Sequence, residues 1–326
     1  MDKKSAIHTM NTLCAEGKPF LFVIDFELVD IQVIPLYSPE HSGILFDVEG
    51  LRNYDQPIQI SGAEFLLNKN PLSKREYGRG FEIVQKGLHR GDSFLVNLTY
   101  PTPIDTNLSL KEIFYRSKAK YKLLYKDKFV CFSPEIFVKI NESGQISSYP
   151  MKGTIDAGIE NAERQILENK KEKAEHNTIV DLIRNDLSKV AREVSVKRYR
   201  YIDKLLTHGK TLLQVSSEIS GQLTPDWRDK LGDILFELLP AGSITGAPKN
   251  ATLKIIDAAE KDKRGFYTGI FGVFDGYTLD SSVMIRFIEQ DENGNKTFRS
   301  GGGITVFSDV DSEYQELIDK VYLPIY

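Results

Sequence analysis

The sequence predicts an α+β fold in which helices cover large antiparallel sheets. Two observations lead to this fold class. Short apolar segments follow one another through tight connections at residues 126–127, 142–144 and 293–294, which is typical of β-hairpins. Helical periodicity is clear only in a few longer segments, which are mixed with the strand candidates rather than strictly alternating with them.

Each element follows from its local pattern. Strands are expected at residues 20–26, 93–99, 128–133, 135–140, 269–276, 281–290 and 296–304. Helices are expected at about 160–191, 227–238, 248–260 and 309–322. In the strand 281–290, Val283, Ile285 and Phe287 should form one face and Arg286 should lie on the other, where a solvated position is the simplest interpretation. No internal repeat or linker marks a boundary, so residues 1–326 are expected to form one domain.

Composition excludes several classes of function. The chain has 326 residues, of which 41% are hydrophobic, so it can bury a large core. Its 42 Lys and Arg residues are balanced by 46 Asp and Glu residues and form no stripe, which argues against a nucleic-acid partner. Cys14 and Cys131 lie outside any metal-binding spacing. The apolar run at 20–24 is too short for a signal peptide or a membrane span, so we expect a cytoplasmic protein with no membrane partner.

The helix expected at 160–191 carries carboxylates on its apolar side. At 100° per residue, Ile179, Ile183 and Val190 form an apolar stripe. Four polar residues fall on or beside this stripe, namely Glu172, Glu175, His176 and Asp186, whereas Asp181, Arg184 and Asn185 point away. A buried carboxylate needs a partner, and either a salt bridge or a shared cation would supply it.

A second pair of carboxylates occurs near the C-terminus. The helix there begins after Ser308 and Asp309, in a capping-box-like start. Glu313 and Glu316 lie together beside its apolar face, three residues apart. Together with Glu172 and Glu175 they could share Mg²⁺, which prefers oxygen ligands. Taken alone, this second pair is equally compatible with a solvated edge.

Two glycine-rich segments could leave their backbone accessible to a ligand. The run 301–303 follows a strand, so its backbone N–H groups could approach an anion, although a bulge would explain it as well. The loop 242–247 precedes a helix with Pro248 in its first turn. Neither segment has the pattern of a Walker loop or of a dinucleotide-binding fingerprint.

Taken in order, the motifs "FSPEIF", "PMKGT", "EKAEHNTIVDLIRNDL", "LPAGSITGAPK", "RGFYTGIFG", "SSVMIR", "GGGI" and "EYQE" resemble the chorismate-utilising enzyme family. The resemblance covers a core of about 91–322, and 1–90 would be a shortened N-terminal part. It implies two large antiparallel sheets packed in a sandwich, with helices outside and the active site between the sheets.

One motif separates subgroups of this family. Anthranilate synthases usually carry Ala in P-x-A-G-T, whereas aminodeoxychorismate synthases carry Lys in P-I-K-G-T, and this chain has Lys152 in "PMKGT". The resemblance therefore implies aminodeoxychorismate synthase component I, which converts chorismate and ammonia to 4-amino-4-deoxychorismate for p-aminobenzoate and folate biosynthesis. Lys152 would form a covalent intermediate, with its pKa lowered by burial, and Glu135 would be the general acid and base.

The resemblance also implies roles for the remaining motif residues. The ring carboxylate of chorismate would lie on Mg²⁺ held by Glu172, Glu175, Glu313 and Glu316. The other substrate-binding positions would be Gly153, Thr154, Gln214, Thr245, Gly246, Tyr267, Arg286, Gly302 and Gly303, with Arg286, Tyr267 and the two C-terminal glycines at the enolpyruvyl carboxylate.

Three departures from the family pattern keep other functions open. Gln214 stands where many members have His, Leu95 stands where amine-forming members have Gln, and the Arg that often follows Thr154 is missing. Anthranilate synthase component I, another chorismate-utilising enzyme, and a non-catalytic chorismate-binding relative remain as alternatives. Because the chain has no amidotransferase signature, ammonia is expected from solution or from a separate glutamine amidotransferase subunit.

Overall fold

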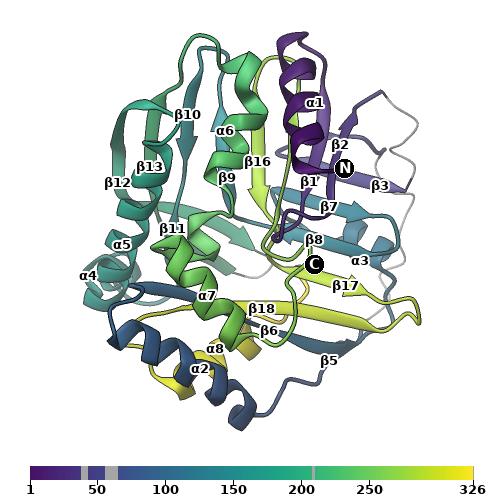
Figure 1. Ribbon diagram of the computed structural model, residues 1–326. Helices are drawn as coiled ribbons and strands as arrows, with labels where there is room; N and C mark the ends of the chain where they lie inside the picture. Colours follow the sequence, from purple (N-terminus) through teal and green to yellow (C-terminus); the bar gives the residue numbers. More distant parts are fainter. Residues whose placement is uncertain (38–42, 56–64, 208–209, 326) are drawn as a thin grey trace.

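Two large antiparallel sheets pack against each other, and helices cover their outer faces (Figure 1). The computed structural model describes residues 1–37, 43–55, 65–207 and 210–325. Each sheet contains nine strands within these ranges. The α+β sandwich predicted from the sequence is confirmed.

The first sheet has the strand order β11-β13-β10-β9-β16-β15-β1-β2, and β12 lies beside β13. Its strands are β1 (Phe20–Ile24), β2 (Ile31–Pro35), β9 (Ile136–Ile140), β10 (Gln145–Ser148), β11 (Met151–Asp156), β12 (Arg192–Thr207), β13 (Lys210–Gln222), β15 (Ile270–Phe274) and β16 (Leu279–Val283). Strand β1, the first strand of the chain, lies between β15 and β2, so the two halves of the chain build one sheet.

The second sheet has the order β14-β6-β18-β17-β8-β7-β3-β4, and β5 lies beside β6. Its strands are β3 (Ile44–Val48), β4 (Leu51–Arg52), β5 (Asn68–Lys69), β6 (Leu95–Asp105), β7 (Tyr121–Tyr125), β8 (Phe129–Ser133), β14 (Gly246–Ala247), β17 (Phe287–Gln290) and β18 (Lys296–Ile304). The longest pairing joins β6 to β18 and places Asn97 opposite Gly303.

The central strands of both sheets are buried on both faces, which explains why they read as continuous apolar runs. In β1, Phe20, Phe22 and Ile24 pack toward the helices, while Leu21 and Val23 pack toward the second sheet. Strand β8 behaves in the same way, because Phe129 and Cys131 face the first sheet and Val130 and Phe132 face outward. The alternation of side chains along a strand therefore builds three layers of core from the two sheets.

The helices form two outer layers (Figure 1). They are α1 (Lys3–Ala15), α2 (Lys74–His89), α3 (Leu110–Arg116), α4 (Ala162–Glu168), α5 (Lys170–Leu187), α6 (Leu231–Leu238), α7 (Lys249–Ala259) and α8 (Val310–Asp319). Helices α1, α5 and α6 share a core with the first sheet, whereas α2 and α7 pack on β6 and α8 packs on β18 of the second. None of the helices in the described ranges combines the length and the apolar character that crossing a bilayer would require.

The predicted elements needed two corrections. The three predicted hairpins are present as β7–β8, β9–β10 and β17–β18. The predicted helix 160–191 is instead two helices, α4 and α5, which are separated at Asn169. The predicted strand 281–290 is also wrong as a single strand, because β16 ends at Val283 in the first sheet and β17 begins at Phe287 in the second. The chain changes sheets through Arg286, whose φ is 54°.

Candidate active site

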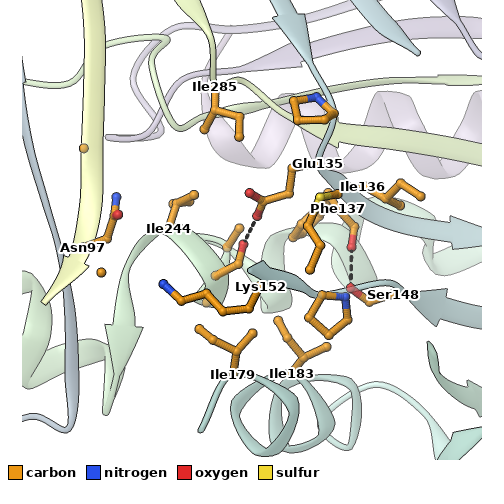
Figure 2. Close-up of a pocket in the computed structure, with 18 of the residues that line it drawn as sticks. Asn97, Glu135, Ile136, Phe137, Ser148, Lys152, Ile179, Ile183, Ile244 and Ile285 are labelled. Atoms are coloured by element: carbon orange, nitrogen blue, oxygen red, sulfur yellow. Dashed lines mark hydrogen bonds between the residues drawn. The ribbon is translucent and has the colours of Figure 1, made fainter. Parts of the chain in front are cut away.

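A cavity of about 230 Å³ lies where the two sheets and helix α5 meet (Figure 2). Strand β6 contributes Leu95 and Asn97, and β18 contributes the glycines 301–303. On the other side the wall comes from β9, from Lys152 on β11, and from Ile179 and Ile183 on α5. The cavity is therefore built from segments that are far apart in the sequence, and it occupies the place between the sheets that the family resemblance implies.

Lys152 extends from β11 into this cavity (Figure 2). Its amino nitrogen lies 2.7 Å from Oε2 of Glu175, which is buried on α5. A Cβ atom added to Gly303 on the opposite sheet would lie 3.9 Å from the same nitrogen. Glycine at this position therefore leaves open the space in front of the lysine amine.

The pKa of Lys152 differs from the sequence-based prediction. Burial lowers this pKa, as predicted, but the carboxylates of Glu175, Glu316 and Glu172 outweigh burial and raise it above the ordinary lysine value. The expectation of a lysine made neutral by burial is therefore wrong for the protein without its ligands. The sequence placed Glu175 on the inner side of its helix, but it did not show that this carboxylate meets Lys152.

Glu135 lies at the start of β9, on another wall of the same cavity (Figure 2). Its carboxyl oxygen Oε1 accepts a hydrogen bond from the hydroxyl of Ser243. Burial raises the pKa of Glu135, and it prevails over the Ser243 hydrogen bond and the charges of Lys320, Arg286 and Lys152, which act in the opposite direction. A carboxyl group with a raised pKa is suited to donate and accept protons near neutral pH.

Among the four predicted metal-binding glutamates, which come from two helices, Glu175 lines the cavity, whereas the other three lie beside Gly153 or Gly302. A Cβ atom added to Gly153 would lie 3.2 Å from Glu172, and one added to Gly302 would lie 3.3 Å from Glu313 and 3.7 Å from Glu316. Glu175 pairs with Lys152, and Glu316 pairs with Lys320 at 2.6 Å.

As they stand, the described residues include no group of three His, Cys, Asp or Glu side chains arranged to hold a metal ion. The carboxylate oxygens nevertheless fit Mg²⁺ in donor type, since Mg²⁺ prefers oxygen ligands, keeps several waters and needs few protein ligands.

A positively charged group lies at the crossover between the sheets. Arg286 lines the cavity, and its Nε atom is buried and has no hydrogen-bond partner within the described ranges. Its Nη1 atom donates to the carbonyl of Lys320 at 3.3 Å. The buried Tyr267 and the bare backbone of Gly302 and Gly303 also line the cavity. These groups could bind a carboxylate.

The other predicted substrate-binding residues are divided between the cavity and its surroundings. Gln214 lines the cavity. Thr154 pairs with Gln214 on the next strand but is exposed outside the cavity. Thr245 is fully buried and donates its hydroxyl proton to the carbonyl of Ala241, and Gly246 has a φ of 123° and packs against β6. In this structure both residues shape the loop behind the cavity.

Sequence reasoning missed several polar residues of the cavity, among them Asn97, Ser243 and Lys320. Lys320 follows Glu316 by one helical turn, and this spacing was a signal that could have identified it. Asn97 shares a face of β6 with Leu95, two residues earlier, which the period of a strand could have shown. For Ser243 the sequence contains no such signal, because its partner Glu135 is distant in the chain.

Comparison with known proteins identifies relatives over the whole chain. The chain is 50% identical over 325 residues to an uncharacterized PabA-like protein of Pasteurella multocida, covering 100% of both chains. It is 53% identical over 321 residues to an uncharacterized PabA-like protein of Haemophilus influenzae, covering 98% of this chain and 96% of the other. It is also 31% identical over 268 residues to the aminodeoxychorismate synthase component 1 of Bacillus subtilis, covering 77% of this chain and 55% of that protein.

The fold is shared with solved structures. The menaquinone-specific isochorismate synthase of Escherichia coli superimposes with a TM-score of 0.73 over 98% of this chain and 81% of that chain, at 14% identity. At this identity the likeness establishes the two-sheet fold alone. The family model described as chorismate binding enzyme matches residues 38–325. The chain therefore belongs to the chorismate binding enzyme family.

Proposed function

We propose that the protein is an aminodeoxychorismate synthase component I, which converts chorismate and ammonia to 4-amino-4-deoxychorismate. The observation that carries this proposal is the position of Lys152, whose amino group projects into the cavity between the two sheets. In the anthranilate-forming version of the motif Ala occupies this position, and it offers no nucleophile. The similarity to the aminodeoxychorismate synthase component 1 of Bacillus subtilis is compatible with this subgroup.

The proposed reaction has two substitutions. Lys152 first gives up a proton, for which Glu175 at 2.7 Å is the nearest acceptor. Its nitrogen then forms a bond to C2 of the chorismate ring, the two ring double bonds shift, and the C4–oxygen bond breaks. Glu135 donates a proton so that the C4 hydroxyl leaves as water. Ammonia then bonds to C4, the double bonds shift back, the bond between C2 and Lys152 breaks, and the Glu135 carboxylate accepts a proton from the new amine.

Charged groups around the cavity would hold the substrate. Arg286, whose Nε has no hydrogen-bond partner among the described residues, and the backbone of Gly302 and Gly303 would bind the enolpyruvyl carboxylate. Glu172, Glu175, Glu313 and Glu316 would hold Mg²⁺ near the ring carboxylate. When bound, Mg²⁺ would supply positive charge that orients the ring and offsets its negative charge. Fixing both carboxylates of the substrate would place C2 within reach of Lys152.

The proposal includes a source of ammonia and a destination for the product. Either free ammonia or a separate glutamine amidotransferase subunit would deliver ammonia to the cavity. The product would then be converted to p-aminobenzoate for folate biosynthesis.

Product identification tests this proposal. The purified protein is incubated with chorismate, Mg²⁺ and an ammonium salt, with and without added aminodeoxychorismate lyase, and the products are separated by chromatography. We expect p-aminobenzoate only when the lyase is present. Anthranilate or isochorismate as the product would contradict the subgroup assignment, and absence of turnover even with an added amidotransferase subunit would favour a chorismate-binding protein without catalysis.

A further inference from the structure

The carboxyl group of Glu135 is held by a side chain from a different part of the fold. The hydroxyl of Ser243 donates a hydrogen bond to Oε1 of Glu135, across 108 positions of the chain, and a dashed line at Glu135 marks this bond in Figure 2. The other carboxyl oxygen, Oε2, has no hydrogen-bond partner within the described ranges. A ligand in the cavity therefore meets a carboxyl group of which one oxygen is engaged and the other is available.

The backbone of Glu135 is fixed independently of its side chain. Its carbonyl oxygen accepts hydrogen bonds from the hydroxyl of Ser282 at 2.7 Å and from the backbone N–H of Val283 at 3.1 Å. Its own N–H donates to the hydroxyl of Ser133 at 3.0 Å. Because the backbone cannot shift, rotation of the side chain is the remaining freedom of the carboxyl group, and the Ser243 hydrogen bond restricts it.

The segment that carries Ser243 is also rigid. Ser243 lies in the 3₁₀ turn Gly242–Ile244, where a Cβ atom on Gly242 would lie 2.8 Å from the buried carboxylate of Asp186. Asp186 in turn pairs with Lys249 at 2.8 Å. The fully buried Arg264 donates to the carbonyl of Ile244 at 2.9 Å and to that of Asn97 at 2.7 Å. Buried contacts therefore hold in place the turn that carries the Ser243 hydroxyl.

We propose that Ser243 is a positioning residue that orients the Glu135 carboxyl group for proton transfer to and from the ligand in the cavity. The inference rests on the proposed role of Glu135. Ser243 touches Glu135 rather than the reacting carbon atoms, so it acts through the carboxyl group. A donor to one oxygen leaves the other free to reach the C4 hydroxyl and the incoming amine.

The same hydrogen bond influences the ionisation of Glu135. Three cationic groups face Glu135, namely Lys320, Arg286 and Lys152, and they favour its charged form together with the Ser243 hydroxyl. Burial opposes all four and raises the pKa of Glu135. Removing the hydroxyl takes away one of the groups that stabilise the carboxylate, so the pKa of Glu135 should rise further and the protonated form should persist to higher pH.

Three variants test the inference, each measured in two ways. Ser243→Ala removes the donor, Ser243→Thr keeps a hydroxyl, and Ser148→Ala removes a hydroxyl of the same cavity that donates at 3.0 Å to the carbonyl of Phe137 instead. The first readout is the pH profile of kcat and KM for chorismate. The second needs no turnover, because difference infrared spectroscopy of the substrate-free protein follows the protonated carboxyl band that Glu135→Gln removes.

For Ser243→Ala we expect kcat to fall about tenfold to a hundredfold while KM changes much less, since misplacement of a catalytic group costs about this much. The carboxyl titration should move to higher pH, Ser243→Thr should restore both properties, and Ser148→Ala should leave the titration unchanged. If Glu135→Gln abolishes turnover while Ser243→Ala changes neither kcat nor the titration, the inference is overturned. If Glu135→Gln retains turnover while Ser243→Ala shifts the titration, the positioning contact is supported and the proposed catalytic role of Glu135 fails.

Discussion

The amino nitrogen of Lys152 and the carboxylate of Glu175 form an ion pair of 2.7 Å inside the cavity between the two sheets. Together with Glu316 and Glu172, this carboxylate raises the pKa of Lys152 in spite of burial. The lysine is therefore held in its charged form, at a defined position, when no ligand is bound. A nucleophilic role requires that substrate binding changes this pairing, because only the neutral amine can attack carbon.

Replacing Glu316 by Gln should weaken Mg²⁺ binding by about tenfold or more, because one of four charged oxygen donors becomes a neutral amide. Calorimetric titration of the protein with Mg²⁺ measures this directly. Asp319→Asn is the matched control, because Asp319 is exposed on the same helix and bonds to Gln315. Equal Mg²⁺ affinity in the parent and in Glu316→Gln would remove Glu316 from the proposed ligands.

Gly246 should tolerate no side chain. A Cβ atom there would lie 1.8 Å from the carbonyl oxygen of Leu95, and φ is 123°. We expect Gly246→Ala to lower the free energy of unfolding by about 3 kcal/mol or more, through overpacking and backbone strain. Gly91→Ala is the control, since its φ is 78° but no atom of the described residues lies within 4 Å of the added Cβ, and it should cost about 1 kcal/mol. Similar urea midpoints for the two variants would contradict the close pairing of β14 with β6.

The buried ion pair between Arg264 and Glu260 should contribute far more to the free energy of unfolding than an exposed ion pair beside it. The side chains of Arg264 and Glu260 are 2% and 6% exposed, whereas those of Lys263 and Asp257 are 78% and 80% exposed. Arg264→Met leaves a buried carboxylate without its partner and should cost about 3–5 kcal/mol of stability. Lys263→Met should cost less than about 1 kcal/mol. Urea unfolding compares the two variants. Equal losses of stability would show that Arg264 does not stabilise the segments behind the cavity.

The sequence predicted the parts of the site that depend on local periodicity. Angular spacing correctly placed Glu175 and Asp186 on the buried side of α5, and Asp181 and Arg184 on its exposed side. Periodicity failed at 281–290, because apolar alternation continues from β16 into β17 although the chain changes sheets between them. A strand in either sheet buries both faces here, so the pattern contains no sign of the crossover.

Some features of the fold and of the site depend on tertiary packing, which local helix and strand propensities do not reveal. Helix α2 was not predicted, and it contains glycines that disfavour a helix. Two of them are needed for close packing, since a Cβ atom on Gly80 would lie 1.9 Å from the hydroxyl of Tyr100 and one on Gly87 would lie 2.6 Å from Ile255. The ion pair of Lys152 and the hydrogen bond of Ser243 were likewise invisible, because each joins distant segments of the chain.

Both cysteines should be unreactive while the protein is folded. Burial raises the pKa of the Cys14 thiol to about 12, and it raises that of Cys131 as well. Because the thiolate is the reactive form, a thiol reagent at pH 8 should label neither residue in the folded protein and both in guanidinium chloride. Rapid labelling of the folded protein would show that one of these thiols is accessible and ionised.

Intact-protein mass spectrometry shows whether Lys152 is the covalent nucleophile. The parent protein, Lys152→Ala and the exposed-lysine control Lys263→Ala are each incubated with chorismate and Mg²⁺ in the absence of ammonia. We expect an adduct of chorismate less water on the parent and on Lys263→Ala, and none on Lys152→Ala. An adduct that persists in Lys152→Ala would show that Lys152 is not the nucleophile.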